Sequence, residues 1–171
     1  MRLWVGLGNP GDKYSNTRHN VGAIILQQLT RGNDYKFDKS LNSMIFKNLS
    51  NDVKYVYLIP MTFMNLSGDA VNKTLRSLNL KPVDLVVFHD EIELPPEQIS
   101  YKFGGGHRGH NGLRDIIQKI GTADFHRIRI GVGRPENEHI SVADYVLSNI
   151  PQKDIPDIEK VEILLRKENL M

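Results

Sequence analysis

The chain alternates between short apolar runs, which are typical of strands, and segments whose apolar residues recur at helical spacing. The apolar runs predict strands at residues 3–7, 44–47, 53–59, 84–88, 99–103 and 127–132. The helical spacing predicts helices at residues 17–30, 67–78, 111–120, 142–147 and 158–165. Strands interleaved with helices predict a single-domain α/β fold over residues 1–171. We expect three layers, a mixed and mostly parallel central sheet, and a helical tail from about residue 140.

Short polar residues mark the expected ends of several elements. Residues 50–52 predict a turn between two strands. Ser67 is expected to cap the helix that follows it, with Asp69 in the first turn, and Asn111 is expected to cap a later helix. Because ligands of α/β sheets gather beyond the carboxyl ends of the strands, we expect the chemistry to lie in the polar and glycine-rich loops.

The composition is that of an ordinary soluble globular protein, 40% hydrophobic and 25% charged. No apolar run is long enough to cross a membrane, and no signal-peptide cleavage site follows the N-terminus, so we expect a cytoplasmic protein. The absence of cysteine excludes disulfides, thiolate metal sites and cysteine nucleophiles.

Charge is unevenly distributed along the chain, although the net charge is only +2. Residues 101–134 hold seven Lys or Arg against two acids, whereas residues 135–171 hold eight acids against four bases. A basic segment beside an acidic tail suits a phosphate-rich ligand. The alternative is that these charges are scattered over a solvated surface.

The first glycine turn, residues 6–11, matches the dinucleotide-binding pattern G-x-G-x-x-G. In a true dinucleotide site, however, the turn opens a helix directly, whereas Pro10 and the polar residues 12–16 delay the helix here. The acidic residue expected at the end of a second strand is also missing. A simple turn is therefore the better interpretation.

His19 and Asp90 are candidate catalytic residues. His19 is expected in the first turn of a helix, where the partial positive charge would lower its pKa and keep the imidazole neutral, as a general base requires. Asp90 follows an apolar strand and could orient that imidazole, as carboxylates do in hydrolase triads. The alternatives are a surface or capping histidine, a turn aspartate, or a metal site that includes the histidines at 89, 107 and 110.

Three asparagines, Asn9, Asn65 and Asn111, stand at turns or helix starts. Their amides could bind a substrate carbonyl and stabilise a developing oxyanion, although capping is the commoner use of asparagine. The glycine run at residues 104–112 leads into a helix and fits phosphate contact, with Lys102 and Arg129 as candidate phosphate ligands. A flexible connecting loop is the alternative.

No nucleophile elbow and no Walker loop occur, so water activated by His19 is the simplest hydrolytic chemistry that the residues allow. Six segments together resemble the bacterial-type peptidyl-tRNA hydrolase family. They occur in the family's order at residues 5–14, 17–22, 60–68, 89–95, 104–113 and 125–133. Each motif alone is weak, but six in order are highly specific.

The resemblance implies a monomeric hydrolase that cleaves the ester between a peptidyl group and the terminal adenosine of tRNA, with no metal or organic cofactor. It implies His19 as the base, oriented by Asp90. The residues that it places around the peptide and ester are Asn9, Tyr14, Met64, Asn65, His110 and Asn111. It implies that Lys102 and Arg129 bind the tRNA 5′ phosphate.

The chain departs from the family at three positions: Glu93 replaces the usual aspartate, and Glu97 and Arg108 stand where glycine is usual. Two other functions stay open. A non-catalytic RNA- or nucleotide-binding module predicts binding without ester cleavage, and a metal-dependent hydrolase predicts loss of activity with a chelator.

Overall fold

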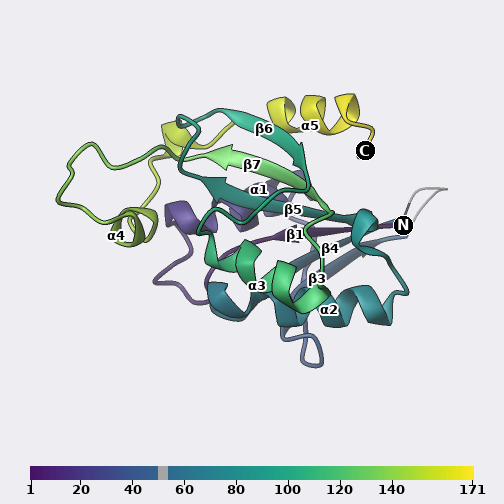
Figure 1. Ribbon diagram of the computed structural model, residues 1–171. Helices are drawn as coiled ribbons and strands as arrows, with labels where there is room; N and C mark the ends of the chain where they lie inside the picture. Colours follow the sequence, from purple (N-terminus) through teal and green to yellow (C-terminus); the bar gives the residue numbers. More distant parts are fainter. Residues whose placement is uncertain (50–53) are drawn as a thin grey trace.

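A seven-stranded sheet runs through the molecule in the order β2-β3-β4-β1-β5-β7-β6 (Figure 1). The computed structural model describes residues 1–49 and 54–171. The parallel strands are β1 (Arg2–Gly6), β4 (Tyr55–Pro60), β5 (Leu85–Glu91) and β7 (His126–Gly131). The antiparallel strands are β2 (Lys36–Asp38) and β3 (Ser43–Asn48) at one edge and β6 (Ile99–Phe103) at the other. The mixed, mostly parallel sheet is thus confirmed, whereas the turn predicted at residues 50–52 lies outside the described residues.

Helices cover both faces of the sheet, and the sheet separates the hydrophobic core into two clusters. The longer helices are α1 (Val21–Leu29), α2 (Ser67–Ser77), α3 (Asn111–Ile120) and α5 (Ile158–Lys167). Helices α1 and α5 share one apolar cluster, and α2 and α3 share the other. Figure 1 shows α5 on the opposite side of the sheet from α2 and α3. The three-layer α/β/α prediction is therefore confirmed.

Short helical segments complete the connections. They are η1 (Arg18–Asn20), η2 (Met64–Leu66), η3 (Pro82–Asp84), α4 (Val142–Val146) and η4 (Gln152–Asp154). The expected helical stretches of the tail, near residues 142–147 and 158–165, are both present. Within the described ranges, no helix is both long and apolar enough to span a bilayer.

Strand β5 is longer than its apolar run predicts. Val86 and Phe88 enter one core cluster while Leu85 and Val87 enter the other, which is why a strand buried on both faces reads as continuously apolar. Pairing with β7 then continues past the apolar residues to Glu91. Asp90 is consequently a strand residue, and the expectation that it follows the strand was wrong.

A glycine brings α1 against the end of β5 that carries Asp90. A β-carbon on Gly22 would overlap the carbonyl oxygen of Phe88, so only glycine allows the helix to lie this close. The same Phe88 carbonyl accepts a hydrogen bond from the Leu7 N–H at 3.1 Å. This close packing sets the start of α1, and His19 before it, beside Asp90.

Two capping predictions were wrong. Helix α2 begins at Ser67 itself, whose hydroxyl donates to the Met64 carbonyl, and the Gly68 N–H donates to the Asp115 carboxylate of α3 at 2.8 Å. Helix α3 is capped by the His110 side chain instead of Asn111. The short edge strand β2 was missed because its three residues, Lys-Phe-Asp, carry no apolar run.

Candidate active site

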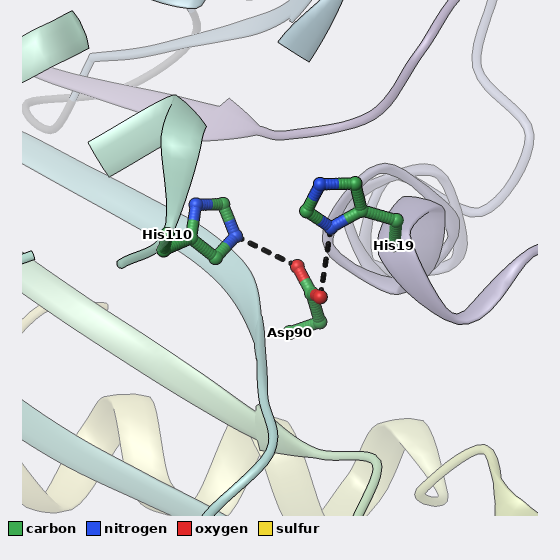
Figure 2. Close-up of side chains that lie close together, drawn as sticks. All are labelled: His19, Asp90 and His110. Atoms are coloured by element: carbon green, nitrogen blue, oxygen red, sulfur yellow. Dashed lines mark hydrogen bonds and ion pairs between the residues drawn. The ribbon is translucent and has the colours of Figure 1, made fainter. Parts of the chain in front are cut away.

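Two histidines from distant parts of the chain converge on one carboxylate (Figure 2). Asp90 Oδ2 lies 2.8 Å from His19 Nδ1, and Asp90 Oδ1 lies 2.8 Å from His110 Nε2. The Asp90 side chain is 3% exposed, against 12% for His19 and 11% for His110. The sequence-based expectation that Asp90 could contact His19 is confirmed as a contact, and His110 joins it as a second partner.

The His19 segment is held in place by the tail of the chain. The Arg18 N–H donates to the Ser148 carbonyl at 3.0 Å, and the Ile150 N–H donates to the Asn16 carbonyl at 2.9 Å. The Arg18 side chain adds a hydrogen bond to the Asn149 carbonyl at 2.9 Å. His19 therefore lies in a 3-10 turn pinned on both sides, just before α1.

Backbone donors determine the tautomer of His110. Its Nδ1 accepts the N–H groups of Gly112 at 3.1 Å and Leu113 at 3.3 Å, at the start of α3. Because Nδ1 is an acceptor, the ring proton is on Nε2, which donates to Asp90. His19 in turn donates from Nδ1 to Asp90, which leaves its Nε2 lone pair free to accept a proton.

The electrostatics favour an ionised Asp90 and a basic His19. Burial by itself would raise the pKa of the Asp90 carboxyl, but electrostatic attraction to the His19 and His110 rings and the hydrogen bonds that they donate hold that pKa well below its ordinary range. Burial opposes protonation of His19, yet the charge and hydrogen bond of Asp90 outweigh it and raise the pKa of His19. The expectation that the helix N-terminus lowers this pKa was wrong, because a carboxylate at 2.8 Å is the stronger influence.

A cavity of about 450 Å³ opens beside this group, and His19, Asp90 and His110 line it. Its lining is strongly basic: Lys102, Arg108, Arg127, Arg129 and Arg134. Asn111 also lines the cavity, at the first position of α3. Five of the seven basic residues of the segment 101–134 therefore line one concave site, which favours the phosphate-ligand interpretation of the charge pattern, whereas Arg114 and Lys119 lie outside its lining.

Asn9 is held by a neighbour that the sequence reasoning missed. Asn20, which is buried, accepts the Asn9 N–H through Oδ1 and donates to the Asn9 carbonyl through Nδ2, both at 2.9 Å. Asn9 Oδ1 accepts the Met64 N–H at 2.7 Å, so the side-chain nitrogen Nδ2 of Asn9 points away from Met64. A β-carbon on Gly8 would collide with the Asn20 amide, so the first glycine turn packs on a side chain. The only signal for Asn20 was its place directly after His19.

The remaining predicted site residues are spread more widely. Met64 is buried, and its sulfur packs against Gly112 beside the His110 ring. Asn65 is exposed on η2, and Tyr14 is half-buried with the Lys13 ammonium 5.3 Å from its ring centre. None of the four predicted residues Asn9, Tyr14, Met64 and Asn65 belongs to the lining of the cavity.

The two expected phosphate ligands, Lys102 and Arg129, differ in the partners that they already have within the protein. Arg129 is bound to Glu91 at 3.5 Å and to the Ser100 hydroxyl at 2.8 Å. Lys102 makes no hydrogen bond or ion pair with any other residue that the structure describes, and its ammonium lies over Gly105. Both side chains line the cavity, so both can reach an anion there.

Two further residues at this site are buried, which the sequence did not predict. Arg127 is 1% exposed and donates to the carbonyls of Gly105, Gly106 and Ala123, so it anchors the glycine run. His89 donates from Nδ1 to the Asp90 carbonyl at 2.9 Å, and burial lowers its pKa to about 3. Alternation along β7 marked Arg127 only as a polar position, because periodicity cannot show that an arginine is buried.

The metal alternative can be tested against the donor chemistry. Among the described residues, His19, Asp90 and His110 form the one group whose potential ligand atoms all lie within 4.8 Å of one another. A metal on His110 Nε2 would require the proton on Nδ1, which already accepts two backbone N–H groups. The residues therefore fit a hydrogen-bonded group better than a metal centre.

A histidine with a carboxylate on one ring nitrogen and a free second nitrogen beside a basic cavity is an arrangement typical of hydrolytic enzymes. The chain matches the family model described as peptidyl-tRNA hydrolase over residues 3–168. It therefore belongs to the peptidyl-tRNA hydrolase family, as its six motifs predicted.

Individual relatives agree with that assignment. The chain is 45% identical to a peptidyl-tRNA hydrolase of Haemophilus influenzae, covering 94% of this chain and 84% of the relative. It is 43% identical to one from Dehalococcoides mccartyi, covering 93% and 86%. Its fold matches the crystal structure of peptidyl-tRNA hydrolase from Acinetobacter baumannii with a TM-score of 0.87 and 36% identity, covering 99% of this chain and 90% of that one.

Proposed function

We propose that this protein hydrolyses the ester that joins a peptidyl group to the 3′-terminal adenosine of tRNA, with His19 as the general base. The observation that carries the proposal is the hydrogen bond between His19 Nδ1 and Asp90, 2.8 Å long, which leaves Nε2 as a proton acceptor. Membership of the family is the basis for the proposed substrate class, and the hydrogen-bonded His19–Asp90 pair is the basis for the proposed general-base chemistry.

In the proposed reaction, His19 Nε2 removes a proton from water as the water oxygen adds to the ester carbonyl carbon. The tetrahedral intermediate then expels the ribose oxygen, which takes the proton back from the His19 imidazolium. The products are tRNA with a free terminal hydroxyl and a peptide with a free carboxyl group. Asp90 stabilises the imidazolium, and a ribose hydroxyl is a far better leaving group than an amine, so one base can suffice.

Amide side chains are proposed to hold the reacting ester. Asn9 Oδ1 is occupied by the Met64 N–H, so its Nδ2 is available as a donor to a carbonyl oxygen. Asn111, at the start of α3, is proposed to bind the ester region from the cavity wall. Asn65, Tyr14 and Met64 are proposed to contact the peptide portion of the substrate. For Asn65 the support is its exposed side-chain amide, which directly follows Met64, the residue whose backbone N–H donates to Asn9 Oδ1.

Lys102 and Arg129 are proposed to bind the 5′ phosphate of the acceptor stem, so that the 3′ end enters the cavity. Their support is their place in a cavity wall with five cationic side chains. We further propose that the chain is one catalytic domain that acts as a monomer in the cytoplasm. Gel filtration of the purified protein tests the monomer.

We propose that no metal or organic cofactor takes part, because His110 is held in the tautomer that lacks a lone pair toward Asp90. Activity is then expected to be insensitive to a chelator. A metal-dependent hydrolase would lose its activity in the same assay.

The decisive experiment measures release of the N-acetyl-aminoacyl group from N-acetyl-aminoacyl-tRNA by the wild type and by His19→Ala, with EDTA present. We expect the variant to lose nearly all activity. His139→Ala is the matched control, because His139 is exposed and lies outside the cavity lining. Unblocked aminoacyl-tRNA tests the expected preference for a blocked substrate.

Equal cleavage by wild type and His19→Ala would refute His19 as the base. If neither protein cleaves the ester but both bind tRNA, the non-catalytic RNA-binding module becomes the better description of the protein.

A further inference from the structure

A tight turn in the glycine run places an arginine at a position where side chains are disfavoured. The His110 N–H donates to the His107 carbonyl at 3.0 Å and closes a turn whose central residues are Arg108 and Gly109. Their φ angles are +49° and +84°. A turn with positive φ at both central positions is the type I′ pattern, which favours glycine, asparagine and aspartate.

The arginine is therefore held at a conformational cost. Left-handed backbone is unfavourable for a residue with a β-carbon, and such strain clusters at active sites and ligand-binding segments. Arg108 is exposed and lines the same cavity as His19 and Asp90.

The charge of Arg108 is not neutralised within the part of the chain that the structure describes. Arg134 is paired with Glu93 and Arg129 with Glu91, whereas Arg108 has no hydrogen bond or ion pair with any described residue. The other acid in the cavity wall, Asp90, is already occupied by two histidines. Arg108 thus offers a free guanidinium two residues from His110.

We propose that Arg108 is a further substrate-binding residue that contacts a backbone phosphate of the tRNA, close to the esterified end. The proposal rests on the proposed function, since it takes tRNA as the substrate. A guanidinium binds a phosphate with two parallel hydrogen bonds, and the neighbouring cations Lys102 and Arg127 favour an anion over any other ligand. Arg108 adds a third cationic side chain to the pair already assigned to tRNA phosphate.

The test compares Arg108→Gly with Glu97→Gly. Glu97 also has a positive φ, +69°, but is exposed outside the cavity lining, so its replacement relieves similar strain without touching the substrate. We expect Arg108→Gly to raise KM for N-acetyl-aminoacyl-tRNA roughly threefold to tenfold with kcat within twofold, as loss of uniform binding predicts. Arg108→Lys should recover part of the loss, and Glu97→Gly should leave KM unchanged.

Two further measurements separate a phosphate contact from other roles. The slope of log(1/KM) against log[salt] should become shallower by about 0.7 to 0.9 for Arg108→Gly, the value for one phosphate. With an N-acetyl-aminoacyl ester of adenosine alone, wild type and variant should have the same KM. Thermal unfolding should show that Arg108→Gly is folded and melts within a few degrees of the wild type.

An unchanged KM and an unchanged salt slope would overturn the proposal. An equal rise in KM for the adenosine ester would overturn the phosphate assignment and place Arg108 against the ester or peptide. If the wild type cleaves no ester, the proposed function fails; direct binding of uncharged tRNA, measured by fluorescence anisotropy, then still tests Arg108. Equal affinity of wild type and Arg108→Gly in that assay would refute it.

Discussion

His110 donates a hydrogen bond to Asp90 Oδ1 at 2.8 Å, while His19 occupies the other oxygen of the same carboxylate. The carboxylate is thus held from two sides, and its rotation is restricted by a residue that belongs to the start of α3. We therefore propose that His110 positions Asp90, and through it the proposed base His19, in addition to any contact with substrate.

Replacing His110 with alanine is therefore expected to slow the reaction without abolishing it. We expect kcat to fall on the order of tenfold to a hundredfold, less than for His19→Ala. Asp90 loses one donor, so its charge acts more strongly on His19, and the acid limb of the kcat/KM profile should move to higher pH. His110→Gln, which keeps an N–H donor, should recover part of the rate. An unchanged limb and rate would show that the contact has no role in positioning.

Asp90→Asn should shift the same limb in the opposite direction. The raised pKa of His19 depends on the Asp90 charge, so its removal lowers that pKa and moves the acid limb of the residual activity to lower pH. An amide can also donate to Nδ1 and put the ring proton on the wrong nitrogen, so kcat should fall roughly 10²- to 10⁴-fold. The kcat/KM profile of a folded variant provides the measurement, and a limb that moves upward would contradict the proposed pairing.

Stability at acid pH should depend on His89. Its folded pKa, about 3, is below the ordinary value of 6.5, so between these values the unfolded chain binds a proton that the folded chain does not. His89 therefore stabilises the fold above pH 6.5, and this stability falls by about 1.4 kcal/mol per unit as the pH decreases toward 3. His19 has the opposite sign: its raised pKa contributes stability that is lost as the pH rises through its folded value.

The window from pH 6 to 4.5 lies above most of the range in which the stability that depends on Asp90 is lost. His126, whose pKa is also lowered, titrates in the same window but contributes equally to wild type and variant, so the difference between their slopes reports His89. Urea unfolding of the wild type and of His89→Gln across this window gives the two slopes. We expect the wild type to lose about 1.4 kcal/mol per unit more than the variant. Parallel slopes would mean that His89 titrates normally in the folded protein.

Asp115 is a residue of α3, and it should stabilise the protein by capping the N-terminus of α2. Its buried carboxylate accepts the Gly68 N–H at the start of α2, so Asp115→Ala leaves that donor unsatisfied. We expect a loss of roughly 1–2 kcal/mol in the free energy of unfolding, with less loss for Asp115→Asn. Asp69→Ala, which removes a solvent-exposed ion pair with Lys119, is the control and should cost clearly less stability than Asp115→Ala. Equal losses for Asp115→Ala and Asp69→Ala would refute this role.

Much of the fold was predictable from local pattern. The run Leu85-Val86-Val87-Phe88 predicts a strand buried on both faces, because a parallel strand covered by helices has no polar face. The helical spacing of apolar residues along α1 and α3 likewise predicts helices with one apolar face, because that face packs against the sheet. The glycine run was predicted only as a loop that leads into a helix, and the structure adds that residues 104, 105 and 109 adopt positive φ.

What the sequence by itself determined is thus the order and type of the elements and the residues able to do chemistry, His19 and Asp90 among them. The tertiary structure alone decided that His110, and not Asn111, caps α3, that Arg127 is buried under the glycine run, and that the pKa of His19 rises. Periodicity is a property of consecutive residues. Capping, burial of a charge and a pKa shift depend on atoms that the crossover connections bring together from η1, β5 and α3, and no local pattern contains those distances.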